Sequence, residues 1–189
     1  MMSDEAAEEF LLQARKIFLR QKRLAERAVE QLSYTQLHER IHPNTNSVSI
    51  IMKHMAGNML SRWTDFLTTD GEKPWRHREN EFVDDLLVPG LIERYWEHGW
   101  VIVFEALSDL NPDDLTRTIL IRGEEHSVIQ AIQRQVDHYG YHVGQIVLIA
   151  KILVGEEWQS LSIPPGGSVE FNEMKRRASD FPGDSSKRH

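Results

Sequence analysis

The 189-residue chain contains no cysteine. This absence excludes disulfide bonds, zinc sites with thiolate ligands and a cysteine nucleophile. Long apolar runs are also missing, since none approaches the roughly 20 residues needed to span a bilayer, and we expect no membrane partner. The first ten residues, MMSDEAAEEF, are acidic and lack the basic-then-apolar order of a secretory signal. We therefore expect a cytoplasmic protein.

Basic residues are fewer than acidic residues. The chain has 22 Lys and Arg against 29 Asp and Glu, a net charge of −7 at pH 7. Proteins that bind nucleic acid usually carry a basic surface, so we expect no nucleic-acid partner. The basic residues at 175–177 and 187–188 lie in a C-terminal stretch rich in Ser, Asp, Pro and Gly, which is typical of a solvated end. The length suits one domain, so we predict a single domain over residues 1–172 and a flexible tail over residues 173–189.

Several motifs that identify enzyme classes are missing as well. The sequence has no Gly-x-Gly-x-x-Gly after a strand, no phosphate-binding P-loop, no Gly-x-Ser-x-Gly and no His-Glu-x-x-His. A di-iron carboxylate bundle would carry Glu-x-x-His on paired helices. The nearest sequences, Glu39-Arg-Ile-His42 and Glu125-His126, fall at predicted helix ends. These absences disfavour nucleotide chemistry, serine hydrolysis and di-iron chemistry.

What the sequence does contain is four segments with apolar residues at helical spacing. They span residues 4–38, 47–66, 89–110 and 127–154. Ser127 with Gln130 forms a capping box at the start of the last segment, and Gly155 suits its end. Residues 115–122 alternate and are β-branched, which predicts a short strand or extended arm before the last helix. The pattern predicts an all-α fold, a four-helix bundle.

Two histidines stand out in the most apolar segment. His138 and His142 lie four residues apart, so they project from the same side of a helix. That helix is apolar over most of its circumference, and buried ring nitrogens need partners, which a metal ion supplies to both at once. A metal site needs further ligands, and His54, on a polar stripe of the 47–66 helix, is the best third. Three neutral nitrogens fit Zn²⁺, Ni²⁺ or Fe²⁺.

Polar residues near these histidines are candidates for orienting the ligands or facing a substrate. They are Asn58, Ser61, Asp65, Arg134 and Gln145. An alternative stays open, in which the histidines are merely buried, or hold a structural ion, in a non-catalytic helical homodimer. The apolar 127–154 helix and three aromatic residues in an exposed register, Trp63, Trp75 and Trp100, are compatible with a dimer.

The placement of the three histidines resembles the DinB/YfiT-like superfamily of metal-dependent proteins. Four stretches look like its DUF1572-type branch: residues 53–66, with His54 and Asn58, residues 68–75, residues 138–146 and residues 161–165. The similarity covers roughly residues 5–172.

This resemblance implies an up-down-down-up bundle, a homodimer and a divalent metal held by His54, His138 and His142. Characterised members of the wider superfamily include bacillithiol- and mycothiol-linked S-transferases and a mycothiol-dependent isomerase. The resemblance therefore implies a metal-dependent enzyme, a thiol S-transferase or a hydrolase, acting on an unknown small molecule. A low-molecular-weight thiol is one candidate partner, although no stretch here matches residues that bind a thiol cofactor.

Overall fold

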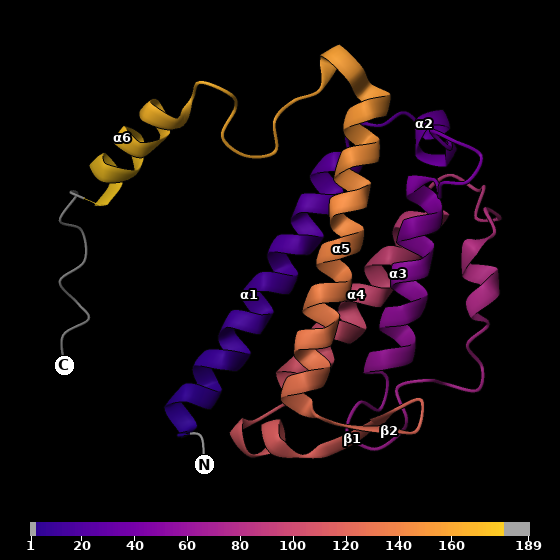
Figure 1. Ribbon diagram of the computed structural model, residues 1–189, viewed down its shortest axis with the longest axis vertical. Helices are drawn as coiled ribbons and strands as arrows, with labels where there is room; N and C mark the ends of the chain where they lie inside the picture. Colours follow the sequence, from indigo (N-terminus) through magenta and orange to yellow (C-terminus); the bar gives the residue numbers. More distant parts are fainter. Residues whose placement is uncertain (1–2, 180–189) are drawn as a thin grey trace. The chain divides into compact units, whose positions relative to one another are not determined.

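The computed structural model describes residues 3–179, which are mostly helical with one small two-stranded sheet (Figure 1). This confirms the helical class predicted from the sequence. The chain divides into two units, one ending at Glu156 and one beginning at Glu157. None of the described helices is both long and apolar enough to cross a membrane.

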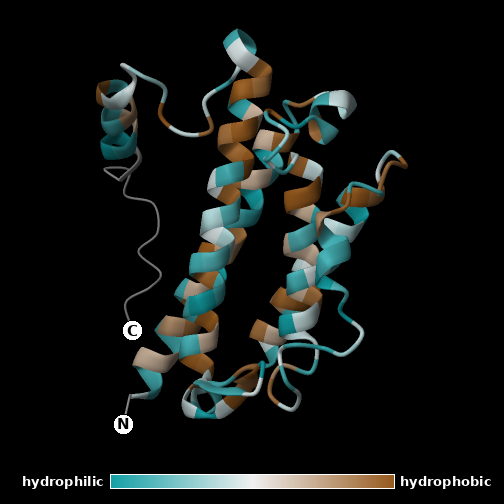
Figure 2. Ribbon diagram, turned by 45° about the vertical axis from the view of Figure 1, so that its right-hand side comes forward, coloured by the Kyte–Doolittle hydropathy of each residue, from teal (hydrophilic) through white to brown (hydrophobic). Residues whose placement is uncertain are grey.

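The first unit contains five α-helices, two 3₁₀ helices and a β-hairpin among its described residues. They are α1 (Asp4–Val29), α2 (Tyr34–His38), α3 (Val48–Trp63), η1 (Arg78–Phe82), α4 (Leu91–Asp109), η2 (Pro112–Thr116), β1 (Thr118–Ile121), β2 (Glu124–Ser127) and α5 (Val128–Val154). The 3₁₀ turn η3 (Gly155–Glu157) follows α5. Helix α1 packs on α5, and α3 packs on α4. Hydrophobic and hydrophilic bands alternate along these long helices in Figure 2, as amphipathic helices around a shared core require.

The helix predicted over residues 4–38 is interrupted, because Ser33 begins a new helix with a capping box. Its hydroxyl accepts from the backbone N–H of Gln36, and the Gln36 side chain accepts from the backbone N–H of Ser33. The helix predicted over residues 47–66 ends early, at Trp63, and Asp65 adopts a left-handed backbone with φ of 48°. The last helix matches its prediction, including the Ser127–Gln130 capping box.

The extended segment predicted near residues 115–122 is one strand of an antiparallel hairpin. Strand β1 pairs with β2, with Thr118 opposite Ser127. The carboxylate of Asp70 accepts hydrogen bonds from the backbone N–H groups of Arg122 and Gly123. The hairpin turn is therefore fastened to the beginning of the long connector between α3 and α4.

One aromatic side chain from each long helix meets in the centre of the first unit. Phe18 of α1 lies 5.7 Å from Trp63 of α3 and 5.6 Å from Tyr139 of α5, and Tyr139 lies 5.7 Å from Trp100 of α4 between ring centroids. All four are fully or almost fully buried. Trp63 and Trp100 are therefore core residues, which corrects the exposed register expected for them; Trp75 is exposed as expected. This cluster holds α3 and α5, the helices that carry the three histidines, in one core.

The second unit contains helix α6 (Ser168–Ser179). Along it, the Lys175 ammonium lies over the Phe171 ring, and Arg177 pairs with Glu173 one turn away. The domain boundary predicted after residue 172 falls inside this helix. Residues 180–189 of the predicted tail lie outside the described residues.

Close packing of α3 on α4 depends on the absence of a side chain at Gly99. A Cβ atom there would lie 3.0 Å from the sulfur of Met59 and 3.1 Å from the Cα of Ala56. Gly144, also within a helix, has nothing within 4 Å of the same position. The two glycines therefore form a matched pair for testing this contact.

We predict that Gly99→Val lowers the free energy of unfolding by about 1–3 kcal/mol, because the added side chain overpacks the α3–α4 contact. Gly144→Ala should raise it by roughly 0.5–1 kcal/mol, because alanine loses less backbone entropy in a helix. Urea denaturation followed by circular dichroism measures both. Equal stability of Gly99→Val and the wild type would contradict this account of the α3–α4 contact.

Candidate metal centre

The structure brings the three predicted histidines together from two helices. His54 comes from the middle of α3, and His138 and His142 from successive turns of α5. One ring nitrogen from each lies within 4.8 Å of the others. Among the described residues, these three form a group of side chains close enough to share one metal ion. His54 is buried, and the other two are half-buried.

The spacing of the nitrogens fits a metal ion. In a tetrahedral zinc site with Zn–N distances of about 2.0–2.1 Å, neighbouring ligand nitrogens lie about 3.3 Å apart. The Nε2 atoms of His138 and His142 are 3.1 Å apart, close to that value. The His54 ring is 4.9 Å from that of His142 and 5.5 Å from that of His138, centroid to centroid. The three rings therefore lie close enough together to share one metal ion.

Two of the rings are oriented by hydrogen bonds from their other nitrogen. Nδ1 of His54 lies 2.8 Å from Oε2 of Glu81, and Nδ1 of His142 lies 2.9 Å from Oε1 of Gln145. Carboxylate and amide oxygens accept, so each Nδ1 donates and each Nε2 is the nitrogen left to face a metal ion. This is the arrangement in which ligand histidines of metal sites are usually held.

The environment keeps the α5 histidines neutral. Burial, together with the neighbouring His142 and His54, lowers the pKa of His138 to about 3. Burial also lowers the pKa of His142 to about 4, although its hydrogen bond with Gln145 acts in the opposite direction. A protonated imidazole cannot bind a metal ion. Both rings are therefore uncharged throughout the neutral pH range, which is the state in which imidazole binds metal ions.

Glu81 is the residue that fixes His54, and it is itself held by an arginine. Burial alone would raise the pKa of Glu81, but hydrogen bonds from His54 and Arg76 outweigh burial and lower it. Arg76 donates to both carboxylate oxygens, over 2.8 and 3.0 Å. A bidentate guanidinium contact of this kind fixes the orientation of the carboxylate and stabilises its ionised form. His54 therefore faces a carboxylate that stays ionised and cannot rotate freely.

Glu81 lies in the connector between α3 and α4, which is held against α3 beside the site. The Lys53 ammonium, one residue before His54, donates to the backbone oxygens of Asn80 and Val83 over 2.6 and 3.0 Å. These bonds hold η1 against α3. Phe82 of η1 stacks on the His54 ring, with 4.9 Å between centroids and 26° between planes.

Glu81 was not among the residues predicted from the sequence, because it lies in a charged connector 27 positions after His54. The available signal was Gly57, one turn beyond His54. A Cβ atom at Gly57 would lie 2.5 Å from Oε1 of Glu81, so this position leaves room for the carboxylate. Arg76 carries no comparable signal in the sequence.

The five supporting residues predicted from the sequence divide into two groups. Gln145 contacts His142, and Asn58 and Arg134 line the cavity beside the histidines. Ser61 lies elsewhere, since its hydroxyl donates to the backbone oxygen of Gly71. Asp65 also lies elsewhere, beyond the end of α3, where it lines a different cavity. The structure therefore places three of the five at the site.

A buried tyrosine connects the histidine site to the aromatic core. The Tyr139 hydroxyl donates to Oδ1 of Asn58 over 3.2 Å and accepts from the Trp63 indole over 3.0 Å. Burial raises the pKa of Tyr139, so its hydroxyl stays protonated and able to donate. The chain of bonds crosses from α5 to α3 one turn beyond His54. It fixes the separation of the two helices at the level of the site.

A cavity of about 340 Å³ opens beside the histidines. His54, His138 and Asn58 form part of its wall. This volume lies at the small end of the range, about 300–1,000 Å³, that is usual for small-molecule sites. The site thus combines three imidazole side chains with space for a small ligand.

Comparison with known proteins identifies one family. The family model described as "Protein of unknown function (DUF1572)" matches residues 5–167. A search of curated proteins gave no match to the chain. The matched segment contains all three histidines as well as Arg76 and Glu81.

We predict that Gly57→Ala weakens zinc binding about 10–100-fold, because the added methyl group displaces the carboxylate that orients His54. The helical fold should be retained, since alanine is a better helix former than glycine. Competition titration against a chromophoric zinc chelator measures the affinity. Gly144→Ala is the matched control and should bind zinc like the wild type. Equal zinc affinity in the two variants would contradict the role assigned to Glu81.

Proposed function

The chain belongs to the DUF1572 family, and we propose that it is a divalent-metal-dependent enzyme with its metal on His54, His138 and His142. The observation that carries this proposal is the convergence of three ring nitrogens within 4.8 Å, beside a cavity that His54 and His138 line. We further propose the up-down-down-up four-helix bundle of the DinB-like superfamily as the scaffold. The course of α1, α3, α4 and α5 in Figure 1 supports this topology.

Three imidazole ligands suit Zn²⁺, Ni²⁺ or Fe²⁺. Such an ion, with positions left open by only three protein ligands, lowers the pKa of a thiol or water that it binds. We therefore propose thiol S-transfer or hydrolysis on a small molecule, with a low-molecular-weight thiol as one candidate partner. The cytoplasm, where such thiols are kept reduced, is the proposed location.

The protein's own residues have defined tasks in this proposal. Glu81 holds the His54 ring in one tautomer and one orientation, and Gln145 does the same for His142. Phe82 covers one face of His54, which limits the approach of water from that side. Asn58, fixed by Tyr139, presents a polar group to the cavity for a bound substrate.

We also propose that the protein forms a homodimer. Tyr141, Leu148 and Ile152 are spaced by seven and four residues, so they share one side of α5, and each is more than half exposed. An exposed apolar stripe of this kind is typical of a surface that a partner covers. A non-catalytic dimer with a structural ion, the second candidate, would share this stripe. The cavity beside the histidines favours the enzyme, because a structural site has a closed ligand shell.

We predict that protein purified without an affinity tag binds close to one equivalent of divalent metal. His54→Ala and His142→Ala should each abolish this binding while the helical content persists, because each removes one of three ligands. His98→Ala, which removes an exposed histidine from α4, should leave it unchanged. Elemental analysis and zinc titration measure the stoichiometry. Absence of bound metal in the wild type, together with no uptake on titration, would overturn the proposed function.

A further inference from the structure

The cavity beside the three histidines is lined by an unusual number of arginines. They are Arg62, Arg76, Arg78, Arg122 and Arg134. The single carboxylate in the wall is Asp137. The chain as a whole carries a net charge of −7, so this concentration of guanidinium groups opposes the general charge of the protein.

The two inner arginines are neutralised by the protein itself. Arg62 and Arg76 are almost completely buried, and both pair with Glu72, over 3.1 and 3.5 Å. Arg76 also pairs with Glu81. These two guanidinium groups brace the connector and the histidine site, so they have little capacity left for a ligand.

The three outer arginines are available to a ligand. The side chains of Arg78 and Arg122 are about half exposed, at 47% and 52%, and each has one carboxylate partner. Glu79, the partner of Arg78, is itself 88% exposed, and a pair so exposed contributes little stability. Arg134 is exposed on α5 and makes no ion pair or hydrogen bond with any residue that the structure describes. Its guanidinium reaches the cavity without a protein partner.

Two buried polar atoms of the cavity wall also lack partners. Nε of Arg62 and Oε1 of Gln135 form no hydrogen bond within the described part of the chain. Both residues are at least nine-tenths buried. Buried polar groups in native proteins are usually paired. Both atoms are themselves covered by protein, so a ligand in the cavity would contact the exposed arginines and not these two atoms.

The charge balance of the site favours an anion. Five guanidinium groups are accompanied by four carboxylates, those of Glu72, Glu79, Glu81 and Asp137, which leaves one positive charge in excess. A cavity with an excess of one charge attracts the opposite charge from solution. Guanidinium groups bind carboxylate and phosphate oxygens in pairs, with a fixed direction. A single anionic group at the mouth would thus be oriented as well as attracted.

We propose that the substrate is a small molecule bearing an oxyanion, a carboxylate or a phosphate, bound by Arg134 together with Arg78 and Arg122. This proposal rests on the proposed function, since it names the substrate class of the same site. The oxyanion is held at the mouth of the cavity, and the remainder of the molecule extends toward His54 and His138. Arg134 is the main determinant, because it alone of the three outer arginines has no protein partner.

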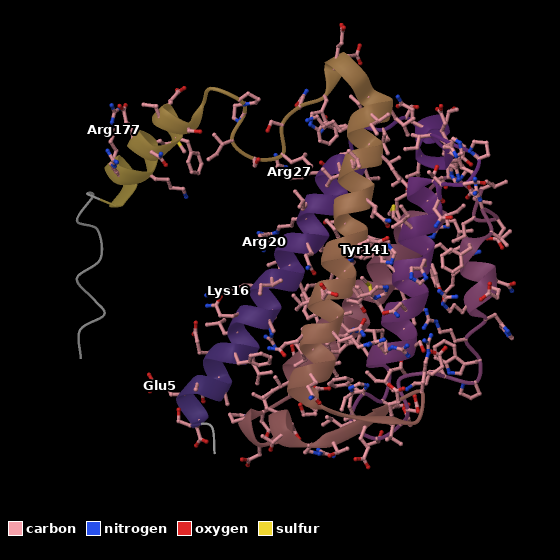
Figure 3. All side chains as sticks on the ribbon, viewed as in Figure 1. Glu5, Lys16, Arg20, Arg27, Tyr141 and Arg177 are labelled. Atoms are coloured by element: carbon pink, nitrogen blue, oxygen red, sulfur yellow. The ribbon has the colours of Figure 1, made fainter. Side chains whose placement is uncertain are left out.

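The test uses three probes of similar size, benzoate, phenylphosphate and the neutral benzamide, titrated into the full chain and followed by heteronuclear NMR. Benzoate and phenylphosphate distinguish the two sources of the oxyanion, and binding of either one with no binding of benzamide supports the proposal. Arg134→Gln should weaken anion binding at least about tenfold, the loss expected for one charge-assisted contact. Arg20→Gln removes the same charge from α1, on the side away from α3 in Figure 3, and should leave binding unchanged.

Zinc uptake is measured in parallel on the same variants, so that failure of the anion site can be distinguished from failure of the metal centre. Arg134→Gln should take up zinc like the wild type. Zinc uptake without binding of either anion would overturn the anion site and leave the metal centre standing. Anion binding without zinc uptake would support the anion site and overturn the proposed enzyme. Anion binding that survives Arg134→Gln but is lost in His142→Ala would place the anion on the metal, and would also overturn the anion site.

Discussion

The site depends on one hydrogen bond, that between Nδ1 of His54 and the carboxylate of Glu81. It joins two segments 27 positions apart, and each end is held by further contacts. Arg76 fixes the carboxylate, and Lys53 holds the connector against α3. A buried carboxylate without such partners would be strongly destabilising. Together these contacts fix both the direction and the tautomer of one of the three rings.

The α5 histidines are controlled differently, by burial and by each other. Their low pKa values come first from desolvation, because both rings are largely buried where α5 meets α3. The Tyr139 bridge to Asn58 and Trp63 then sets how far α5 stands from α3. The ring nitrogens thus converge because a polar bridge and an aromatic cluster fix two helices in one core. Around them, arginines make the cavity locally basic, although the chain as a whole carries a net negative charge.

Much of this arrangement can be predicted from the sequence, and there is a physical reason why the remaining residues cannot be assigned in this way. The 3.6-residue period identifies the long helices, and the Ser127 capping box fixes the start of α5. His138 and His142 can be assigned to one site because they lie four residues apart on the same helix. His54 can be assigned because it lies on a polar stripe of a regular helix. Glu81 and Arg76 cannot be assigned in the same way, because a connector has no period from which the direction of a side chain can be inferred.

Errors in the predicted helix boundaries also follow from local backbone effects. The break between α1 and α2 depends on the hydrogen bonds of Ser33 and Gln36, which helical periodicity does not register. The early end of α3 coincides with the left-handed backbone at Asp65. Trp63 and Trp100 were expected in an exposed register. The packing of four helices brings Phe18 and Tyr139 against them, and both tryptophans are buried.

X-ray absorption spectroscopy at the zinc edge, on untagged protein loaded with one equivalent of zinc, tests the central claim most directly. It reports both the type and the distance of the atoms bound to the metal. The account predicts three imidazole nitrogens at about 2.0–2.1 Å, and no imidazole-bound zinc in His54→Ala protein treated in the same way. A first shell made only of oxygen, or an imidazole signal unchanged by that substitution, would contradict it.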